Sequence, residues 1–258
     1  MRPIAPNAFK RALAARSVPQ LGCWLSMNSL AATEIAAGIG FDWVLLDMEH
    51  SPYDLETVER HLLAARHGGD AEFVVRIPSI DPILVKRLLD AGIRSFMFPF
   101  VQTVEEARLA AASVRFPPHG IRGYSGNSRS VRFGTITGYH AKAHEDICVI
   151  LQIETPLAVA TIPEFARIEG IDGLLIGPND LAANMGLLGG AYHADTLAKI
   201  AEARQLMQAG GIAAGMLDFK PESARQLFAD GFNFIAVGGD TSMIVKGSRA
   251  LLGEFGRG

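Results

Sequence analysis

The chain has little of what marks several common protein classes. Its two cysteines, Cys23 and Cys148, each sit in an apolar run, so a disulfide framework or a CxxC-type zinc or redox site is not expected. Lys and Arg number 24 against 27 Asp and Glu, which argues against a nucleic-acid-binding surface. Apolar runs fall short of the roughly 18 residues that a membrane span needs. We therefore expect a cytoplasmic protein without a nucleic-acid or membrane partner.

Two enzyme signatures are also missing. A Gly-x-Gly-x-x-Gly turn, which would support a dinucleotide-binding fold, is absent, and so is the Gly-x-Ser-x-Gly elbow of serine hydrolases. Schiff-base chemistry needs a buried lysine, and only Lys220 of the six lysines lies near the end of an apolar run. We discount Lys220 as a Schiff-base lysine.

Short apolar runs alternate with stretches of helical periodicity. Gly40, Gly92, Gly170 and Gly231 each follow a helix-like stretch and precede an apolar run, as a glycine that ends a helix in the left-handed conformation would. Eight runs are strand candidates: Gly22–Leu25, Trp43–Asp47, Phe73–Ile77, Ser95–Pro99, Ile147–Ile153, Gly173–Ile176, Ile212–Leu217 and Phe234–Val237. Eight strands alternating with helices predict an α/β fold, a (β/α)8 TIM barrel.

The whole chain, residues 1–258, is expected to form this single barrel domain. A short amphipathic helix from about Asn7 to Ala15 would close the bottom of the barrel, and a C-terminal helix would lie at a subunit interface. The longest irregular stretch, Arg115 to Gly138, is rich in Gly, Pro, Ser and Arg, and a loop of that length in a compact domain is usually functional.

In such barrels the catalytic groups follow the strands at their carboxyl ends. Gln152 and Glu154 alternate onto the same side of one strand, and Asp180 follows the next strand. Two converging carboxylates without His or Cys would suit Mg²⁺ or Mn²⁺, with Co²⁺ as a third option. The alternative is structural: Glu154 would pair with an arginine, and Asp180 would cap the helix that starts near Leu181.

Three further groups point to the same end of the barrel. The turn Gly177-Pro178-Asn179-Asp180 runs into a helix and could hold a substrate carboxylate on its backbone amides, or be an ordinary capped loop. His50 follows two acids at a strand end, where a barrel places an acid/base group. Arg76 would be costly inside a barrel unless an anion met it, which favours contact with substrate or a carboxylate.

Asp90 lies in the last turn of its predicted helix, just before Gly92. A negative charge there opposes the helix dipole, which hints at a purpose beyond local stability. Asp230 stands in the same position before Gly231, so the hint alone is weak.

The residues together resemble the HpcH/HpaI family of class II, metal-dependent 2-oxo-acid (pyruvate) aldolases. The likeness covers nearly the whole chain in order and is carried by these segments: Phe41–Pro52, Leu88–Gly92, Gly120–Gly123, Gln152–Thr155 and Asp172–Leu181. Tyr124–Gly134 departs from the family's Gly- and Ala-rich version of that stretch.

The resemblance implies a role for each candidate residue. Glu154 and Asp180 would bind the divalent metal, while Gln152, Asn179 and the turn that begins at Gly177 and Pro178 would line the pyruvate site. His50 would be the base, Arg76 would stabilise the transition state, and Asp90 would tune the histidine of a neighbouring subunit. Members are typically homohexamers.

The implied reaction is the reversible aldol cleavage of 4-hydroxy-2-oxo acids to pyruvate, or to a related 2-oxo acid such as hydroxypyruvate, and an aldehyde, by way of a metal-bound enolate. A CoA-ester lyase of the malyl or citramalyl type would share this chemistry. A phosphosugar isomerase with its phosphate at Gly238-Gly239-Asp240, or a non-catalytic metabolite-binding barrel, is a more distant alternative.

Overall fold

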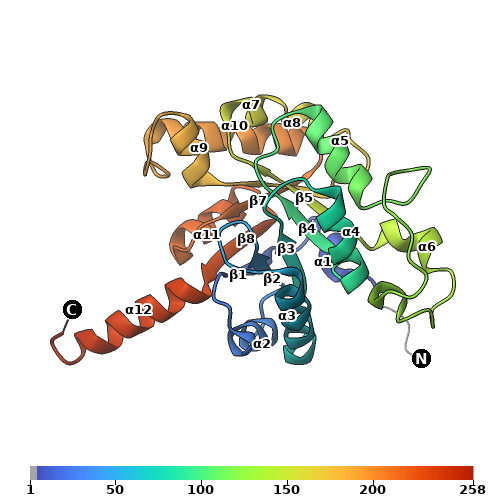
Figure 1. The fold of residues 1–258 in the computed structure, drawn as a ribbon. Coiled ribbons are helices and arrows are strands. Elements are labelled where there is room, and N and C mark those ends of the chain that lie inside the picture. The colour runs from blue at the N-terminus through green and yellow to red at the C-terminus, as the bar shows by residue number, and fades with distance from the viewer. Residues whose placement is uncertain (1–4, 258) are drawn as a thin grey trace.

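The computed structural model describes residues 5–257, and its eight parallel strands close into one barrel (Figure 1). The strands are β1 Gln20–Leu25, β2 Trp43–Asp47, β3 Glu72–Arg76, β4 Ser95–Phe98, β5 Cys148–Ile153, β6 Gly173–Ile176, β7 Ala213–Leu217 and β8 Phe234–Gly239. Each pairs with the next, and β8 pairs with β1. The predicted (β/α)8 TIM barrel is confirmed, and every strand candidate lies within a residue or two of its observed bounds.

Most of the helices surround the strands on the outside. They are α1 Ala8–Ala15, α2 Leu30–Gly38, α3 Leu55–Gly68, α4 Pro82–Ala91, α5 Val104–Ser113, α6 Tyr139–Lys142, α7 Pro156–Ala160, α8 Ile162–Phe165, α9 Pro178–Asn184, α10 Ala194–Gly210, α11 Pro221–Ala229 and α12 Asp240–Gly253. Two short 3₁₀ helices, Arg129–Val131 and Ala143–Glu145, lie in the long stretch between α5 and β5. The four glycines expected to be left-handed have φ from 99° to 115°. Along residues 5–257, no helix is long and apolar enough to cross a lipid bilayer.

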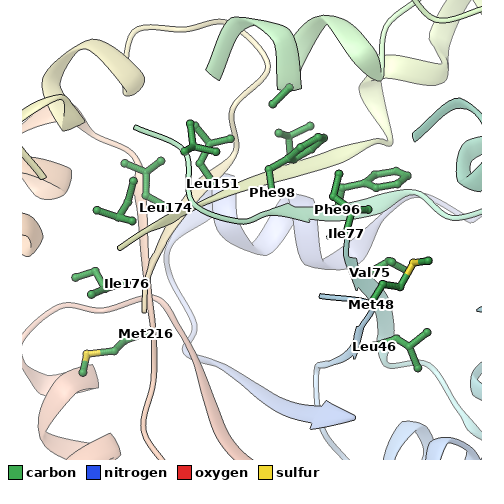
Figure 2. Packing of buried hydrophobic residues seen from close by; sticks show 14 of the residues in the cluster. Leu46, Met48, Val75, Ile77, Phe96, Phe98, Leu151, Leu174, Ile176 and Met216 are labelled. Carbon is green, nitrogen blue, oxygen red and sulfur yellow. The ribbon is translucent and has the colours of Figure 1, made fainter. Parts of the chain in front are cut away.

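Side-chain alternation along each strand divides the apolar residues into two cores. Outward-facing residues such as Leu46, Val75 and Leu151 pack beneath the helices (Figure 2). Inward-facing residues such as Trp43 and Phe234 fill the inside of the barrel. Because strand side chains alternate with a period of two, the inward set continues to the carboxyl ends of the strands and places polar residues at the mouth.

Helix α1 closes the opposite, amino-terminal end of the barrel, as the sequence predicts. The Phe9 ring stacks on Trp43 with centroids 5.5 Å apart, and Lys10 forms an ion pair with Asp172 at 3.0 Å. The buried Asn7 side chain caps the helix by accepting a hydrogen bond from the Lys10 N–H and donates one to Ser95 Oγ at 2.8 Å. The bottom of the barrel is therefore sealed.

Candidate active site

The mouth of the barrel gathers most of the predicted site residues. Asp47, Arg76 and Gln152 continue the inward faces of β2, β3 and β5, and Glu154 follows β5 directly. All four are at least nine-tenths buried. The expectation that Gln152 and Glu154 share one side of β5 is met by a hydrogen bond of 2.7 Å from Gln152 Nε2 to Glu154 Oε1.

Arg76 is held rigidly by two carboxylates of the β2 end. Its Nε and Nη2 donate to the two oxygens of Asp47 at 2.8 and 2.6 Å, and its Nη1 lies 2.8 Å from Glu49 Oε2. The Glu49 contact is a close charge contact without hydrogen-bond alignment, because that oxygen has no hydrogen-bond partner among the described residues. Nη1 also donates to Gln152 Oε1 at 3.4 Å, and the guanidinium lies over the Trp24 ring.

The pKa values of the two acids around Arg76 are shifted in opposite directions. Burial would raise the pKa of Asp47, but the hydrogen bonds and charge of Arg76 more than offset it, so the pKa is lowered. The pKa of Glu49 is raised, mainly by burial, despite the nearby Arg76 charge. The Arg76 charge thus favours the ionised form of both acids, but only at Asp47, where hydrogen bonds add to it, is burial outweighed.

Glu154 is a buried carboxyl group among other acids. Burial is the main reason why its pKa is raised to about 8; the Phe100 N–H, which donates to Oε2 at 2.9 Å, opposes this, and the charges of Asp180 and Glu49 add to it. The Arg76 charge also lowers the pKa of Glu154, but not enough to keep this carboxyl group ionised at neutral pH.

Gly177 lets the β6 turn approach Glu154 closely. A Cβ at this position would lie 2.6 Å from Glu154 Oε1 and 2.8 Å from its Cγ. Pro178 is buried behind it, and Asn179 and Asp180 are exposed at the mouth in the first turn of α9. The Asn184 side chain joins this turn to β5 by donating to the carbonyls of Asp180 and Glu154.

These residues fit a divalent cation of the kind that uses few protein ligands. Within residues 5–257, no group of three or more His, Cys, Asp and Glu is arranged to hold a metal ion. Mg²⁺ is usually bound by one or two carboxylates, with waters and substrate oxygens completing its shell. Glu154, with its raised pKa, and the neighbouring Asp180 supply such a pair, and a cation between them would provide the missing positive charge.

His50 stands at the rim of the same mouth. Its ring is 66% exposed, and Nε2 lies 3.9 Å from Glu49 Oε2. Asp47 Oδ1 fixes the backbone by accepting hydrogen bonds from the N–H groups of Glu49 and His50. The His50 imidazole is therefore open to a substrate, while the His50 backbone is anchored to Asp47, the partner of Arg76.

Asp90 is the one predicted site residue that the fold does not bring to the mouth. It lies at the carboxyl end of α4, and a helix of this fold runs opposite to the strands, so Asp90 is at the bottom of the barrel. Its carboxylate faces Arg122, with Oδ1 3.5 Å from Nη2. Within one chain, Asp90 cannot act on His50.

Besides the Arg76 partners Asp47 and Glu49, two contributions to the site were missed. Phe100, just after β4, has φ of 52°, a strained conformation for an aromatic residue, and this conformation accompanies the hydrogen bond from its N–H to Glu154. The sequence carries no signal for it, since glycine is the residue expected at such a φ.

Asp240, at the start of α12, is the second. Its buried carboxylate accepts hydrogen bonds from the N–H groups of Ser26 and Met27, and so ties β8 to the loop after β1. A carboxylate in this place would repel a phosphate, which argues against the phosphate site considered for Gly238-Gly239-Asp240. The sequence could name Asp240 but not its partners, which lie more than 200 residues away.

Comparisons with known proteins show the family of the chain. A family model described as HpcH/HpaI aldolase/citrate lyase matches residues 20–247. A 5-keto-4-deoxy-D-glucarate aldolase from Salmonella arizonae is 42% identical over 252 residues, which are 98% of each chain. The protein of the same name from Escherichia coli K12 is 41% identical over the same coverage.

Solved structures share the fold. An HpcH/HpaI aldolase/citrate lyase family protein from Burkholderia cenocepacia J2315 superposes with a TM-score of 0.94 at 37% identity, covering 96% of this chain and 99% of that one. A citrate lyase beta subunit from Mycobacterium tuberculosis, complexed with oxaloacetate and magnesium, has a TM-score of 0.54 at 18% identity, covering 86% and 92%, and shows a likeness of fold alone.

Proposed function

The chain belongs to the HpcH/HpaI aldolase/citrate lyase family and is a carbon–carbon lyase of the aldolase kind, and from that premise we propose that it cleaves 4-hydroxy-2-oxo acids into pyruvate and an aldehyde. Hydroxypyruvate is an alternative to pyruvate as the 2-oxo acid. The observation that carries the proposal is the buried Glu154, linked by Gln152 to the anchored guanidinium of Arg76.

We assign Glu154 and Asp180 as ligands of Mg²⁺ or Mn²⁺. The cation, when bound, supplies a Lewis acid that takes up negative charge at the keto oxygen of the substrate. Gln152 orients Glu154 by its 2.7 Å hydrogen bond, and Gly177 leaves the space that Glu154 occupies. The N–H groups of Asn179 and Asp180 would hold the substrate carboxylate, since the Gly177 N–H donates to the Ile153 carbonyl at 3.1 Å and Pro178 has no N–H.

Arg76 and His50 would act on the reacting atoms. Arg76 presents a fixed positive charge where the enolate oxygen becomes negative, and a preorganised donor of this kind contributes about 10²–10³ in rate. His50 accepts the proton of the 4-hydroxyl group as the bond between C3 and C4 breaks. The aldehyde leaves, and C3 of the enolate is then protonated to give pyruvate.

The site is completed, in this proposal, by a second copy of the chain. Asp90 would act on the His50 of a neighbouring subunit, since it cannot reach its own. Helix α12 supports an assembly: it extends away from the barrel (Figure 1), and Met243, Ile244, Leu251 and Leu252 on it are exposed. We infer a homo-oligomer, a hexamer by family resemblance, in which α12 lies at an interface. The size of the assembly is checked by light scattering.

We further propose that the whole chain forms one aldolase domain and that it works in the cytoplasm. Both of its cysteines, Cys23 and Cys148, are buried free thiols, which is ordinary for a reducing compartment.

Metal removal tests the proposal directly. Exhaustive chelation should abolish cleavage of 5-keto-4-deoxy-D-glucarate, and Mg²⁺ or Mn²⁺ should restore it. Glu154→Gln should lose metal affinity and about 10³-fold or more in kcat, because it removes a ligand and with it the metal's contribution. Glu169→Gln, at an exposed glutamate far from the mouth, should keep both.

Three results would contradict the proposal. Activity that survives chelation would exclude the metal assignment. A borohydride-trapped adduct with pyruvate would point to a lysine. Cleavage of malyl-CoA or citramalyl-CoA, with no cleavage of 4-hydroxy-2-oxo acids, would favour the CoA-ester lyase.

A further inference from the structure

Arg122 is an unusual arginine for the interior of a protein. Its side chain is 1% exposed, in the long stretch between α5 and β5. Within the described part of the chain, its Nε and Nη1 are buried without a hydrogen-bond partner. Its Nη2 lies 3.5 Å from Asp90 Oδ1, which is its one ion pair among residues 5–257.

The surroundings of Arg122 fix its position without neutralising it. Its guanidinium lies over the ring of Phe116 at 4.4 Å and over that of Tyr139 at 5.9 Å. Its backbone N–H donates to the Arg115 carbonyl at 2.8 Å. These contacts hold the side chain against the end of α4, and aromatic faces attract a cation without consuming its hydrogen-bond donors.

Fold stability does not explain an arginine at this position. Each buried donor left without a partner destabilises the fold, and a buried ion pair is often no more stabilising than apolar side chains of the same volume. A methionine could cover Phe116 and Tyr139 at no such cost. The feature that only a cation supplies is a positive charge beside Asp90.

The contact with Asp90 is of a different kind from the contact inside the mouth. Arg76 binds both oxygens of Asp47 at 2.6–2.8 Å and so satisfies that carboxylate. Arg122 approaches only Oδ1 of Asp90, at the limit of a hydrogen bond, and the Asp90 side chain is 29% exposed. Arg122 therefore restrains Asp90, and its positive charge offsets the unfavourable interaction of this carboxylate with the dipole of α4. The carboxylate still remains open to a further partner.

We propose that Arg122 is a positioning residue, which holds Asp90 by one oxygen and leaves the other oxygen for the His50 ring of a neighbouring subunit. The inference rests on the proposed function, because it requires Asp90 to act on a neighbour's His50. It adds a residue that touches neither substrate nor metal and that acts through the carboxylate alone.

The test is a double-mutant cycle on the metal-loaded oligomer. Arg122→Met should lower kcat about 10–100-fold, the usual loss when the partner of a site residue is removed, with KM for the oxo acid and metal affinity unchanged. Its melting temperature should stay the same or rise, because a buried charge is replaced by an apolar side chain. Arg122→Lys, which retains the charge, should recover part of kcat.

Asp90→Asn supplies the second arm. The double variant should be no slower than Asp90→Asn alone, because Arg122 has nothing left to position. Arg115→Met is the matched control, since it removes an arginine of the same stretch that pairs instead with Glu169. It should retain kcat.

The outcomes separate this inference from the proposed function. If Asp90→Asn is impaired while Arg122→Met keeps its kcat, or if the two losses add in the double variant, the positioning role is wrong and the proposed function stands. If Arg122→Met lowers both the melting temperature and kcat, and Arg122→Lys restores neither, Arg122 has a structural role only. If Asp90→Asn is fully active, both the proposed role of Asp90 and this inference fail.

Discussion

The two ends of the barrel each hold an arginine–carboxylate cluster, and the clusters differ in charge balance. At the bottom, Arg94 binds Glu72 through Nε and Nη2 at 3.1 and 2.8 Å, and Ser95 and Asn7 donate to the same carboxylate. At the mouth, Arg76 faces Asp47 and Glu49, with Glu154 and Asp180 close by. The bottom cluster is satisfied by the protein itself, whereas the mouth retains an excess of negative charge.

This difference separates stability from function. A satisfied cluster holds α1 and the strand starts together and needs no ligand. Burial, with a smaller contribution from the neighbouring acids, raises the pKa values of Glu154 and Glu49, and a bound cation would oppose this rise.

The largest expected effect is on catalysis at the mouth. Arg76→Met should lower kcat about 10²–10³-fold, because it removes a preorganised positive charge next to the developing enolate. Metal binding, followed by Mn²⁺ titration, should persist because Glu154 and Asp180 remain. Unchanged turnover would show that Arg76 serves only to pair with Asp47.

The matching change at the bottom should affect stability instead. Asn7→Ala removes the cap of α1 and the hydrogen bond to Ser95, so the free energy of unfolding should fall by about 2–3 kcal/mol. Denaturant unfolding measures the loss, and kcat of the folded enzyme should not change. A drop in kcat without loss of stability would contradict the view that the bottom of the barrel serves stability and the mouth serves catalysis.

The smallest effect expected concerns pH and metal affinity. Below pH 8 the Glu154 carboxyl group of the metal-free protein is protonated, because its pKa is raised to about 8. Binding must displace that proton, so affinity should fall by about tenfold for each pH unit below 8 and level off above it. Calorimetry in buffers of different ionisation enthalpy should detect about one proton released at pH 7. Affinity that is independent of pH between 6 and 8 would place the metal elsewhere.

Much of the fold could be predicted because its signals are local. Left-handed glycines such as Gly92 and Gly231 mark helix ends, and the apolar runs between them mark strands. The alternation that sets Gln152 beside Glu154 is likewise a property of one strand. The outward and inward cores follow from the same rule.

The pairings across the barrel could not be predicted in the same way. The sequence predicts that Arg76 needs an anionic partner. Only the closed barrel shows that Asp47 and Glu49 are that partner. The Phe100 N–H reaches Glu154 only through a backbone conformation that phenylalanine rarely adopts. The partnership of Asp90 with Arg122 depends on the path of a long irregular segment, for which a sequence pattern gives no geometry.

Position 177 sets a limit on how this catalyst could be redesigned. Even a single methyl group there would collide with Glu154, so alanine would already displace a proposed metal ligand. Mutant libraries that aim to admit other aldehydes should therefore keep Gly177 unchanged. They should vary the rim instead, for example at Phe100. Its side chain is exposed, and only its backbone N–H contacts Glu154.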